Sequence, residues 1–383
     1  MIYFDNAATS WPKPPAVARA VAASIDAGGN PGRSGHRLSI QAARTLEDAR
    51  DAVARLLHAS DPARIVFAPN ATHALNLALY GLLRPGGRVV TTALEHNAVM
   101  RPLRHLERDG VAVDVVPGGG ATVSLEALEE ALKPGASLLV TTHASNVTGD
   151  VLPIGAIGAI ARRYHVPYLV DAAQSAGTVP IDVSREPLDL VAFTGHKGLM
   201  GPTGTGGLYV REGITLTPLV RGGTGSDSTR EEQPAFLPDA YEAGTQNAAG
   251  LAGLAAGVRF ILEAGVEAVQ AHERSLALRF IERAASVPGL RVHGPVGAER
   301  GGIVSFNMQG MTPAEVGQVL EDSFGVLARV GLHCAPAAHR SIGTFPDGTV
   351  RFSFGWFNTA ADVDTAVDGL RTMAAWNAAS VTS

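Results

Sequence analysis

Lys197 lies in the part of this 383-residue sequence whose residue types point most directly to chemistry. It ends the run Thr194-Gly-His-Lys197, which follows an apolar strand pattern and precedes a glycine-rich loop and a second strand pattern. A lysine nucleophile must be partly deprotonated, and a desolvated position lowers its pKa. Flanking glycines let a planar ligand approach the backbone. Because an exposed loop lysine is the common alternative, this segment needs a second group to support it.

Asp171 supplies that second group. It directly follows Tyr168-Leu-Val170 and therefore ends a strand pattern. A lysine that can form a Schiff base and a carboxylate that keeps a pyridine nitrogen protonated are the pair that pyridoxal phosphate requires. An aspartate in this place can also cap the following helix. Taken together, the two residues predict a pyridoxal-phosphate site.

The phosphate of such a cofactor needs its own binding groups. Pro69-Asn-Ala-Thr-His73 follows a strand pattern and opens a helix pattern. Backbone N–H groups and a hydroxyl at a helix start can bind a phosphate. The same residues would equally make a plain helix cap, and the sequence does not separate these two readings. Thr194 and His196 could add contacts from the lysine loop.

Cys334 is the only cysteine, so the chain cannot form an intramolecular disulfide. The neighbouring His333 and nearby Arg329 could favour its thiolate. A buried structural cysteine is the ordinary alternative, but the surrounding residues predict a polar loop. A metal site made from His333, Cys334 and His339 has irregular spacing, and we predict no metal.

The elements that must position these residues alternate between strand and helix patterns. Strands are predicted at 64–68, 88–92, 111–116, 137–141, 168–170 and 190–193, and helices at 44–57, 72–83, 125–132 and 154–164. This alternation predicts βαβ units and a mainly parallel, buried sheet. Ligands of such sheets bind outside the carboxyl ends of the strands. Lys197 and Asp171 both follow such ends, which predicts one composite site.

The pattern changes after Gly250. A long helical pattern covers 251–285 with a break near Gly265, followed by strands at 302–308 and 350–356 and helices at 313–324 and 360–373. This predicts a large domain over 31–250 and a smaller α+β domain over 251–383, with residues 1–30 packing against the small domain.

Composition narrows the class of protein. Hydrophobic residues make up 46% and charged residues 17%, so the chain can bury a sizeable core. The formal net charge is -5 and the basic residues are scattered, which argues against nucleic-acid or anionic-membrane partners. No signal-peptide pattern and no transmembrane-length apolar run is visible. We therefore expect a cytoplasmic protein.

Ten segments, in order along the chain, resemble class V aminotransferase-fold pyridoxal-phosphate enzymes. Within that class they resemble the cysteine desulfurases of the SufS-like and selenocysteine lyase-like branch. The matching segments are Tyr3–Thr9, Gly29–His36, Ala71–Thr72, Glu95–Asn97, His143–Asn146, Val170–Gln174, Thr194–Lys197, Tyr241–Thr245, Arg329–Cys334 and Val350–Ser353. The resemblance implies an α/β protein of the pyridoxal-phosphate transferase fold type I, with a mainly parallel sheet of seven-stranded type in the large domain.

The resemblance also implies an activity. Lys197 would carry the cofactor and move protons, His96 would stack on the cofactor ring, and Cys334 would take sulfur from L-cysteine as a persulfide, leaving L-alanine. The sulfur would pass to an acceptor protein that the sequence does not name, in a pathway such as iron–sulfur cluster assembly. The implied cofactor-binding residues are Ala71, Thr72, His96, Asn146, Asp171, Gln174, Thr194, His196, Lys197 and, from the partner subunit of a homodimer, Thr245. The implied substrate-binding residues are Arg351, which would clamp the carboxylate, Asn146, His36 and Arg329.

Several alternatives stay open at this point. The residues after Cys334 depart from the best-known SufS-like pattern, which leaves the substrate and the sulfur acceptor undecided. A selenocysteine lyase, another pyridoxal-phosphate β-lyase or an aminotransferase could use the same scaffold. A nucleotide-binding dehydrogenase is disfavoured because Gly204-Thr-Gly-Gly207 leads into a strand and lacks the required glycine spacing. A catalytically idle scaffold protein would be expected to have lost Lys197 or Asp171.

Overall fold

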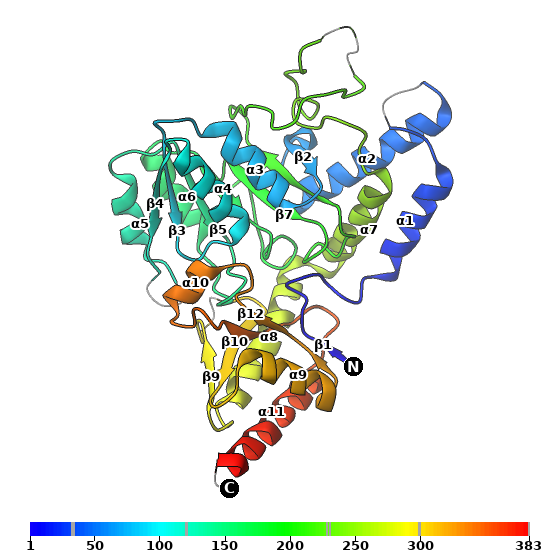
Figure 1. Cartoon of the computed structure of the whole chain (residues 1–383). Coiled ribbons are helices and arrows are strands. Elements are labelled where there is room, and N and C mark those ends of the chain that lie inside the picture. The colour runs from blue at the N-terminus through cyan, green and yellow to red at the C-terminus, as the bar shows by residue number, and fades with distance from the viewer. Residues whose placement is uncertain (32–34, 119–121, 227–228, 230, 298–299, 382–383) are drawn as a thin grey trace.

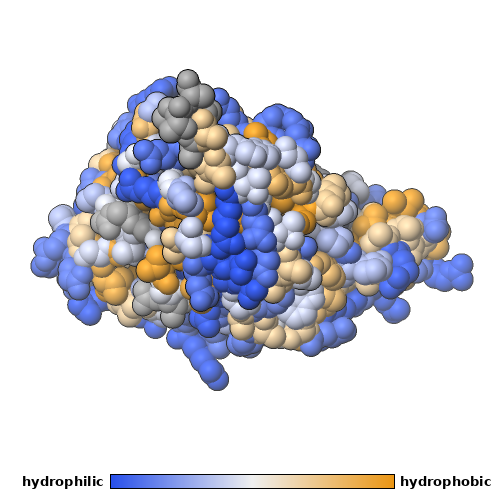
Figure 2. Space-filling view, turned by 90° about the horizontal axis from the view of Figure 1, so that it is seen from below, coloured by the Kyte–Doolittle hydropathy of each residue, from blue (hydrophilic) through white to orange (hydrophobic). Residues whose placement is uncertain are grey.

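A computed structural model of the chain describes residues 1–31, 35–118, 122–226, 229, 231–297 and 300–381. Its elements form two units, one around a large sheet and one around a small sheet (Figure 1). Seen from below, hydrophobic side chains form patches between hydrophilic ones (Figure 2). Among the described residues no single helix is long and apolar enough to cross a bilayer, and the one helix pair that qualifies jointly is bent by 82°.

The larger unit contains a seven-stranded sheet in the order β2-β8-β7-β6-β5-β3-β4. Its strands are β2 (Ile65–Ala68), β3 (Arg88–Thr92), β4 (Ala112–Val116), β5 (Leu138–Thr142), β6 (Tyr168–Asp171), β7 (Leu190–Thr194) and β8 (Gly206–Val210). Pairing is parallel from β7 through β6, β5 and β3 to β4, whereas β8 is antiparallel to both of its neighbours. The predicted mainly parallel α/β sheet is therefore confirmed.

Helices cover both faces of this sheet. They are α2 (Arg37–Leu56), α3 (Ala71–Leu82), α4 (Asn97–Arg108), α5 (Leu125–Leu132), α6 (Ile154–Arg163) and α7 (Ala248–Ala264), with a 3-10 turn at Pro62–Arg64. Successive strand residues enter opposite cores: Leu138 packs with α3 and α4, and Leu139 packs with α5 and α6. This follows from the two-residue period of a strand. Both faces are covered, which explains why the central strands are apolar throughout.

The second unit contains a four-stranded antiparallel sheet in the order β12-β13-β10-β9. Its elements are α8 (Val266–Ala284), β9 (Leu290–His293), β10 (Ile303–Met308), α9 (Pro313–Phe324), β12 (Arg329–Gly331), α10 (Pro336–Ser341), β13 (Thr349–Ser353) and α11 (Ala360–Val381). The predicted long helix is two helices that meet at Gly265, which has a φ of 85° that glycine adopts readily.

The N-terminal residues contact both units. β1 (Ile2–Tyr3) pairs in parallel with β11 (Val326–Leu327), and Phe4 is buried in the core of the second unit. In contrast, α1 (Pro15–Ala27) packs against α7, and the buried residues of α7 belong to the core of the larger unit. The domain boundaries at 30 and 250 stay predictions.

Candidate active site

Lys197 lies in the turn between β7 and β8. Gly195 shapes this turn: its N–H donates to the Thr205 carbonyl at 2.8 Å, and a Cβ on it would come 2.0 Å from the Thr205 hydroxyl. Any other residue type at this position would displace the Thr205 side chain. Burial lowers the pKa of Lys197 to about 8, with Asp171 acting in the opposite direction. A substantial neutral fraction near neutral pH makes the amine available as a nucleophile and base.

Asp171 ends β6, the strand next to β7, and pairs in register with Ala192. Its side chain is buried, and one carboxylate oxygen accepts a hydrogen bond from the Ala173 N–H at 2.9 Å. Burial raises its pKa, while that hydrogen bond and Lys197 counteract the rise. A buried carboxylate with a free oxygen is well placed to pair with a protonated ring nitrogen.

Both residues line one cavity of about 90 Å³ at the carboxyl ends of the strands. The cavity lining includes all predicted cofactor-binding residues except Thr245, namely Ala71, Thr72, His96, Asn146, Asp171, Gln174, Thr194, His196 and Lys197. These residues come from five separate segments of the chain. The parallel sheet brings them together because its strands end at the same edge.

One part of this cavity suits an anion. It contains the start of α3, where the Asn70 side chain caps the helix by accepting from the His73 N–H at 2.9 Å. The Thr194 hydroxyl and the Nδ1 atom of His196 are buried there, and neither has a hydrogen-bond partner among the described residues. Buried polar atoms are normally satisfied. Unsatisfied donors beside a helix N-terminus therefore fit the phosphate of pyridoxal phosphate.

His96 caps α4 from the cavity wall, with its Nδ1 atom accepting the Ala98 N–H at 3.0 Å. Burial, followed by the positive charge of Lys197, lowers the pKa of His96 to about 4. The imidazole is therefore neutral at physiological pH, which suits stacking on a planar ring. Gln174 projects from the segment after Asp171 and donates to the Ala7 carbonyl at 3.1 Å.

Arg351 lies on β13, only 2% exposed. Its Nη2 atom is 2.8 Å from an Asp5 carboxylate oxygen, and its Nη1 atom donates to the Asn146 carbonyl at 3.2 Å. Arg329 is half-buried and lies opposite Arg351 in the β12–β13 register. The two guanidinium groups make this region positively charged, with Asp5 as the partner that sequence analysis missed. Only its place in the matching segment Tyr3–Thr9 could have pointed to it.

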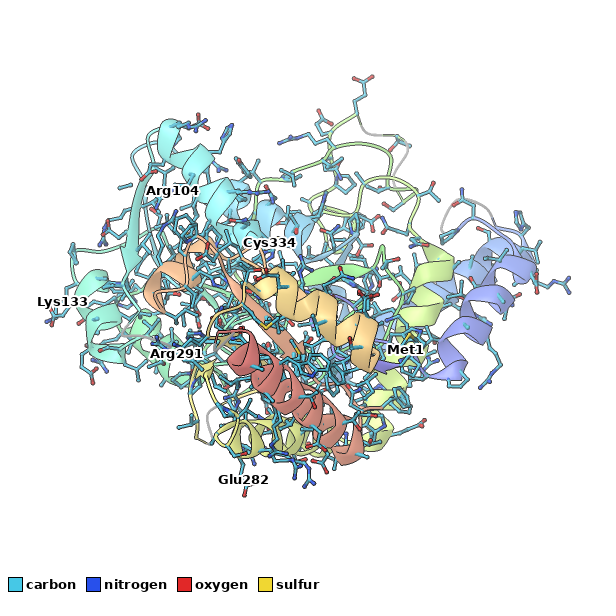
Figure 3. All side chains as sticks on the ribbon, turned by 60° about the horizontal axis from the view of Figure 1, so that its bottom comes forward. Met1, Arg104, Lys133, Glu282, Arg291 and Cys334 are labelled. Carbon is cyan, nitrogen blue, oxygen red and sulfur yellow. The ribbon has the colours of Figure 1, made fainter. Side chains whose placement is uncertain are left out.

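Cys334, which Figure 3 labels, is exposed. Two hydrogen bonds join its segment to the larger unit. The Cys334 carbonyl accepts from the Asn97 N–H at 2.7 Å, and the His333 carbonyl accepts from the Asn146 side chain at 2.7 Å. Cys334 and His333 have φ values of 58° and 48°. Such left-handed geometry costs a non-glycine residue about 1 kcal/mol, and these hydrogen bonds help to stabilise it.

Two expectations about this segment were wrong. His333 is buried and makes a 3.0 Å hydrogen bond to the Thr349 hydroxyl, and burial lowers its pKa to about 2. It is therefore neutral and cannot stabilise a Cys334 thiolate by charge, which leaves Arg329 and Arg351 as the nearby cations. The residues after Cys334 are not a polar loop, because they form α10 with His339 fully buried. In the described part of the chain, no three His, Cys, Asp or Glu side chains gather as metal ligands would.

His36 and Thr245 lie outside the cavity of a single chain. His36 is exposed and caps α2, with its Nδ1 atom accepting the Ser39 N–H at 3.3 Å. Residues 32–34 of its matching segment lie outside the described residues. Thr245 is also exposed, just before α7. The predicted role of Thr245 requires a second subunit. The roles of both residues stay predictions.

Glu95 is a further buried group that sequence analysis did not single out. One carboxyl oxygen accepts from the Thr92 hydroxyl at 2.6 Å and from the Thr142 N–H at 3.0 Å. Burial raises its pKa to about 8, so it is largely protonated at neutral pH. Through these bonds Glu95, the residue before His96 in the chain, connects β3 to β5.

Known proteins are similar to this chain in sequence and in architecture. The model of the family "Aminotransferase class-V" matches residues 2–366. A probable cysteine desulfurase of Methanothermobacter thermautotrophicus is 34% identical over 97% of this chain and 94% of its own length. A probable cysteine desulfurase of Mycolicibacterium paratuberculosis is 35% identical over 98% of this chain, which spans 55% of that relative.

Solved structures agree with these sequence matches. The apo structure of a cysteine desulfurase from Thermococcus onnurineus has a TM-score of 0.91 and 34% identity, covering 98% of this chain and 95% of its own. A cysteine desulfurase from Escherichia coli, crystallised as an S-sulfonic acid, has a TM-score of 0.87 and 29% identity, covering 98% and 94%.

Proposed function

We propose that this chain, which belongs to the aminotransferase class-V family, is a pyridoxal-phosphate-dependent cysteine desulfurase that converts L-cysteine to L-alanine. The observation that carries the proposal is the attachment of the exposed Cys334 segment to Asn146, a residue of the Lys197 cavity. This attachment supports a site in which the Cys334 thiol would act as a nucleophile together with the cofactor-binding Lys197. The family match and the relatives named cysteine desulfurase support the same conclusion.

The cavity residues would hold the cofactor by its separate parts. Asp171 would pair with the ring nitrogen, His96 would stack on the ring, and Gln174 and Asn146 would contact the ring hydroxyl. The α3 start with Ala71 and Thr72, together with Thr194 and His196, would bind the phosphate. When bound, pyridoxal phosphate supplies an electron sink for the charge left at the substrate Cα.

The remaining steps belong to side chains of this chain. Arg351 would bind the substrate carboxylate, and Lys197 would remove the Cα proton and later return a proton. The Cys334 thiolate would attack the substrate sulfur, so that an S–S bond forms as the Cβ–S bond breaks. The electron pair of the broken bond and a proton complete the methyl group of alanine. The balance is L-cysteine plus one thiol giving L-alanine plus one persulfide.

Finer parts of this proposal concern assembly and sulfur delivery. We place the protein in the cytoplasm as a homodimer in which Thr245 reaches the phosphate of the partner's site. We also propose that the Cys334 persulfide passes to an acceptor protein, with iron–sulfur cluster assembly as a pathway that would use it. The exposure of Cys334 and Thr245 supports these proposals.

The decisive experiment compares wild type with Cys334→Ala and Cys334→Ser under reducing conditions. Wild type should produce alanine from L-cysteine, while both variants should lose at least about 90% of this activity and keep bound cofactor, measured by absorbance. Mass spectrometry without reductant should find one added sulfur atom on the peptide that contains Cys334. Equal activity in all three proteins would refute the role of Cys334 and favour a lyase. Preferential turnover of L-selenocysteine by Cys334→Ala would identify a selenocysteine lyase.

A further inference from the structure

A second cavity lies next to the Lys197 site and takes no part in the steps above. It has a volume of about 40 Å³ and shares Lys197, Gln174 and Ala144 with the larger cavity. From there it extends to Glu273 on α8 and to Gly302 before β10. We call this space the rear cavity.

Glu273 is the unusual residue of the rear cavity. Glu273 is only 8% exposed. Among the described residues, its carboxyl group makes no hydrogen bond or ion pair. Burial raises its pKa to about 8, and no neighbouring charge contributes. A buried carboxyl group without a protein partner is costly unless water satisfies it.

The rear cavity is suited to hold that water. Among the residues that the structure describes, its lining contains only two ionisable side chains, Glu273 and Lys197. The remaining polar groups are neutral, and they come from Asn6, Ser10, Ser145, Gln174, Thr178, Gln270 and Ser353. A buried water needs about 10–15 Å³ of cavity volume and two to four polar neighbours. The space therefore accommodates roughly three waters.

We propose that the rear cavity holds a file of ordered waters through which Glu273 exchanges a proton with Lys197 while the lysine is a free amine. The Glu273 carboxylic acid releases a proton to the first water, and the last water delivers one to the lysine nitrogen. The products are a carboxylate and an ammonium group, and the reverse transfer restores both. No oxidant or other reactant is needed.

Similar proton affinities make this exchange reversible. Burial brings the pKa of Glu273 up and that of Lys197 down, each to about 8, so neither group retains the proton strongly against the other. The exchange would allow a proton taken from the substrate to be replaced by one from solvent. This role rests on the proposed function, since it concerns the proton that Lys197 carries during turnover.

The first test follows the hydrogen on Cα during turnover of L-cysteine in D₂O. Wild type should give alanine with deuterium at Cα. Glu273→Gln keeps the size of the side chain but cannot donate and recover the proton in this way, so the protium fraction at Cα should rise at least about twofold. Glu282→Gln removes a charge from the exposed surface of the same helix and should match wild type (Figure 3).

A second variant leaves Glu273 in place. Gly301 lines the rear cavity, and a Cβ added to it would meet no atom closer than 3.9 Å, so Gly301→Ala should fold. Its methyl group would take up space next to the waters and should also increase the protium fraction. An unchanged fraction in both folded variants would overturn the proposal, because solvent would then reach Lys197 by another route.

Infrared spectroscopy of the cofactor-free protein tests the acid without relying on turnover. A protonated carboxyl band that is absent in Glu273→Gln should be present below pH of about 8 and disappear above it. The band should shift promptly in D₂O if water reaches Glu273. A band that does not shift would show a dry cavity and overturn the proposal. Absence of alanine from wild type would instead refute the proposed function, with the infrared result unaffected.

Discussion

Arg351 is oriented by the protein before any substrate binds. One terminal nitrogen contacts Asp5 and the other contacts the Asn146 carbonyl. Its Nε atom is buried and has no hydrogen-bond partner in the described part of the chain. A planar guanidinium can keep such contacts and still donate to a carboxylate. A lysine ammonium group is a compact charge, and it cannot donate hydrogen bonds to Asp5, the Asn146 carbonyl and a substrate carboxylate at once.

This geometry predicts the effect of Arg351→Lys. Losing a charge-assisted hydrogen bond costs about 1.5–3 kcal/mol, so KM for L-cysteine should rise roughly 10- to 100-fold. The change in kcat should be smaller, because the substituted group binds the carboxylate and does not touch the bonds that break. Steady-state kinetics would measure the split. Arg340→Lys, at an exposed position on α10, should leave both constants near wild type, and an equally unaffected Arg351→Lys would contradict the assigned role.

Residue types at the site were predictable, but their protonation states were not. Lys197 and Asp171 follow strands in the sequence, and the parallel sheet necessarily brings such positions together. In contrast, Asp5 reaches Arg351 across 346 positions of the chain, which no local pattern encodes. His333 shows the second difficulty, because its charge depends on burial that only the folded chain defines.

Helices and strands were predicted best where their sequence patterns are long or have clear ends. Residues 125–132 and 313–324 form helices with the predicted bounds. The helix at 97–108 was missed; it contains Pro102, a residue that normally disfavours a helix interior. α10 and β12 are too short for a periodic signal, and β12 exists because β13 pairs with it.

A buried ion pair joins three elements near the predicted subunit boundary. Glu242 accepts from both terminal nitrogens of Arg50 at 2.8 and 3.0 Å, and from the Phe67 N–H at 2.6 Å. It therefore ties α2 and β2 to the segment that leads to Thr245. Both charged side chains are buried, so each depends on the other.

Glu242→Gln should lower the free energy of unfolding by roughly 3–5 kcal/mol, because Arg50 would stay buried without its countercharge. Urea denaturation would measure the loss. The exposed pair Arg104–Glu107 provides a matched control, since Glu107→Gln should change stability by less than about 1 kcal/mol. Replacing both buried partners, as in Arg50→Met with Glu242→Leu, should recover part of the loss. If Glu242→Gln lowers the free energy of unfolding no more than Glu107→Gln does, the ion pair does not stabilise the fold as argued.

At the scale of the whole molecule, the site depends on both units and on the chain terminus. Asp5 and Ser353 pair through their backbones in an isolated parallel β-bridge. The Asn6 side chain donates to the Ser353 carbonyl at 3.0 Å. The N-terminal segment thereby joins β13, which carries Arg351, to the cavity beside Lys197. Thr245 is exposed and does not line the Lys197 cavity of its own chain.

A shared site makes a specific prediction for mixed dimers. Thr245→Asp would place a negative charge next to the partner's phosphate, so this variant should fold but bind cofactor at least roughly tenfold more weakly. Lys197→Ala should be inactive. A heterodimer of the two contains one site with an intact Lys197 and an intact Thr245, because each comes from a different chain. Co-expression with two tags, assayed at limiting cofactor, should therefore give more alanine than either variant gives alone. Thr365→Asp, exposed on α11, should bind cofactor normally. A monomer of 39.6 kDa in light scattering, or a heterodimer without activity, would show that each chain forms its site alone.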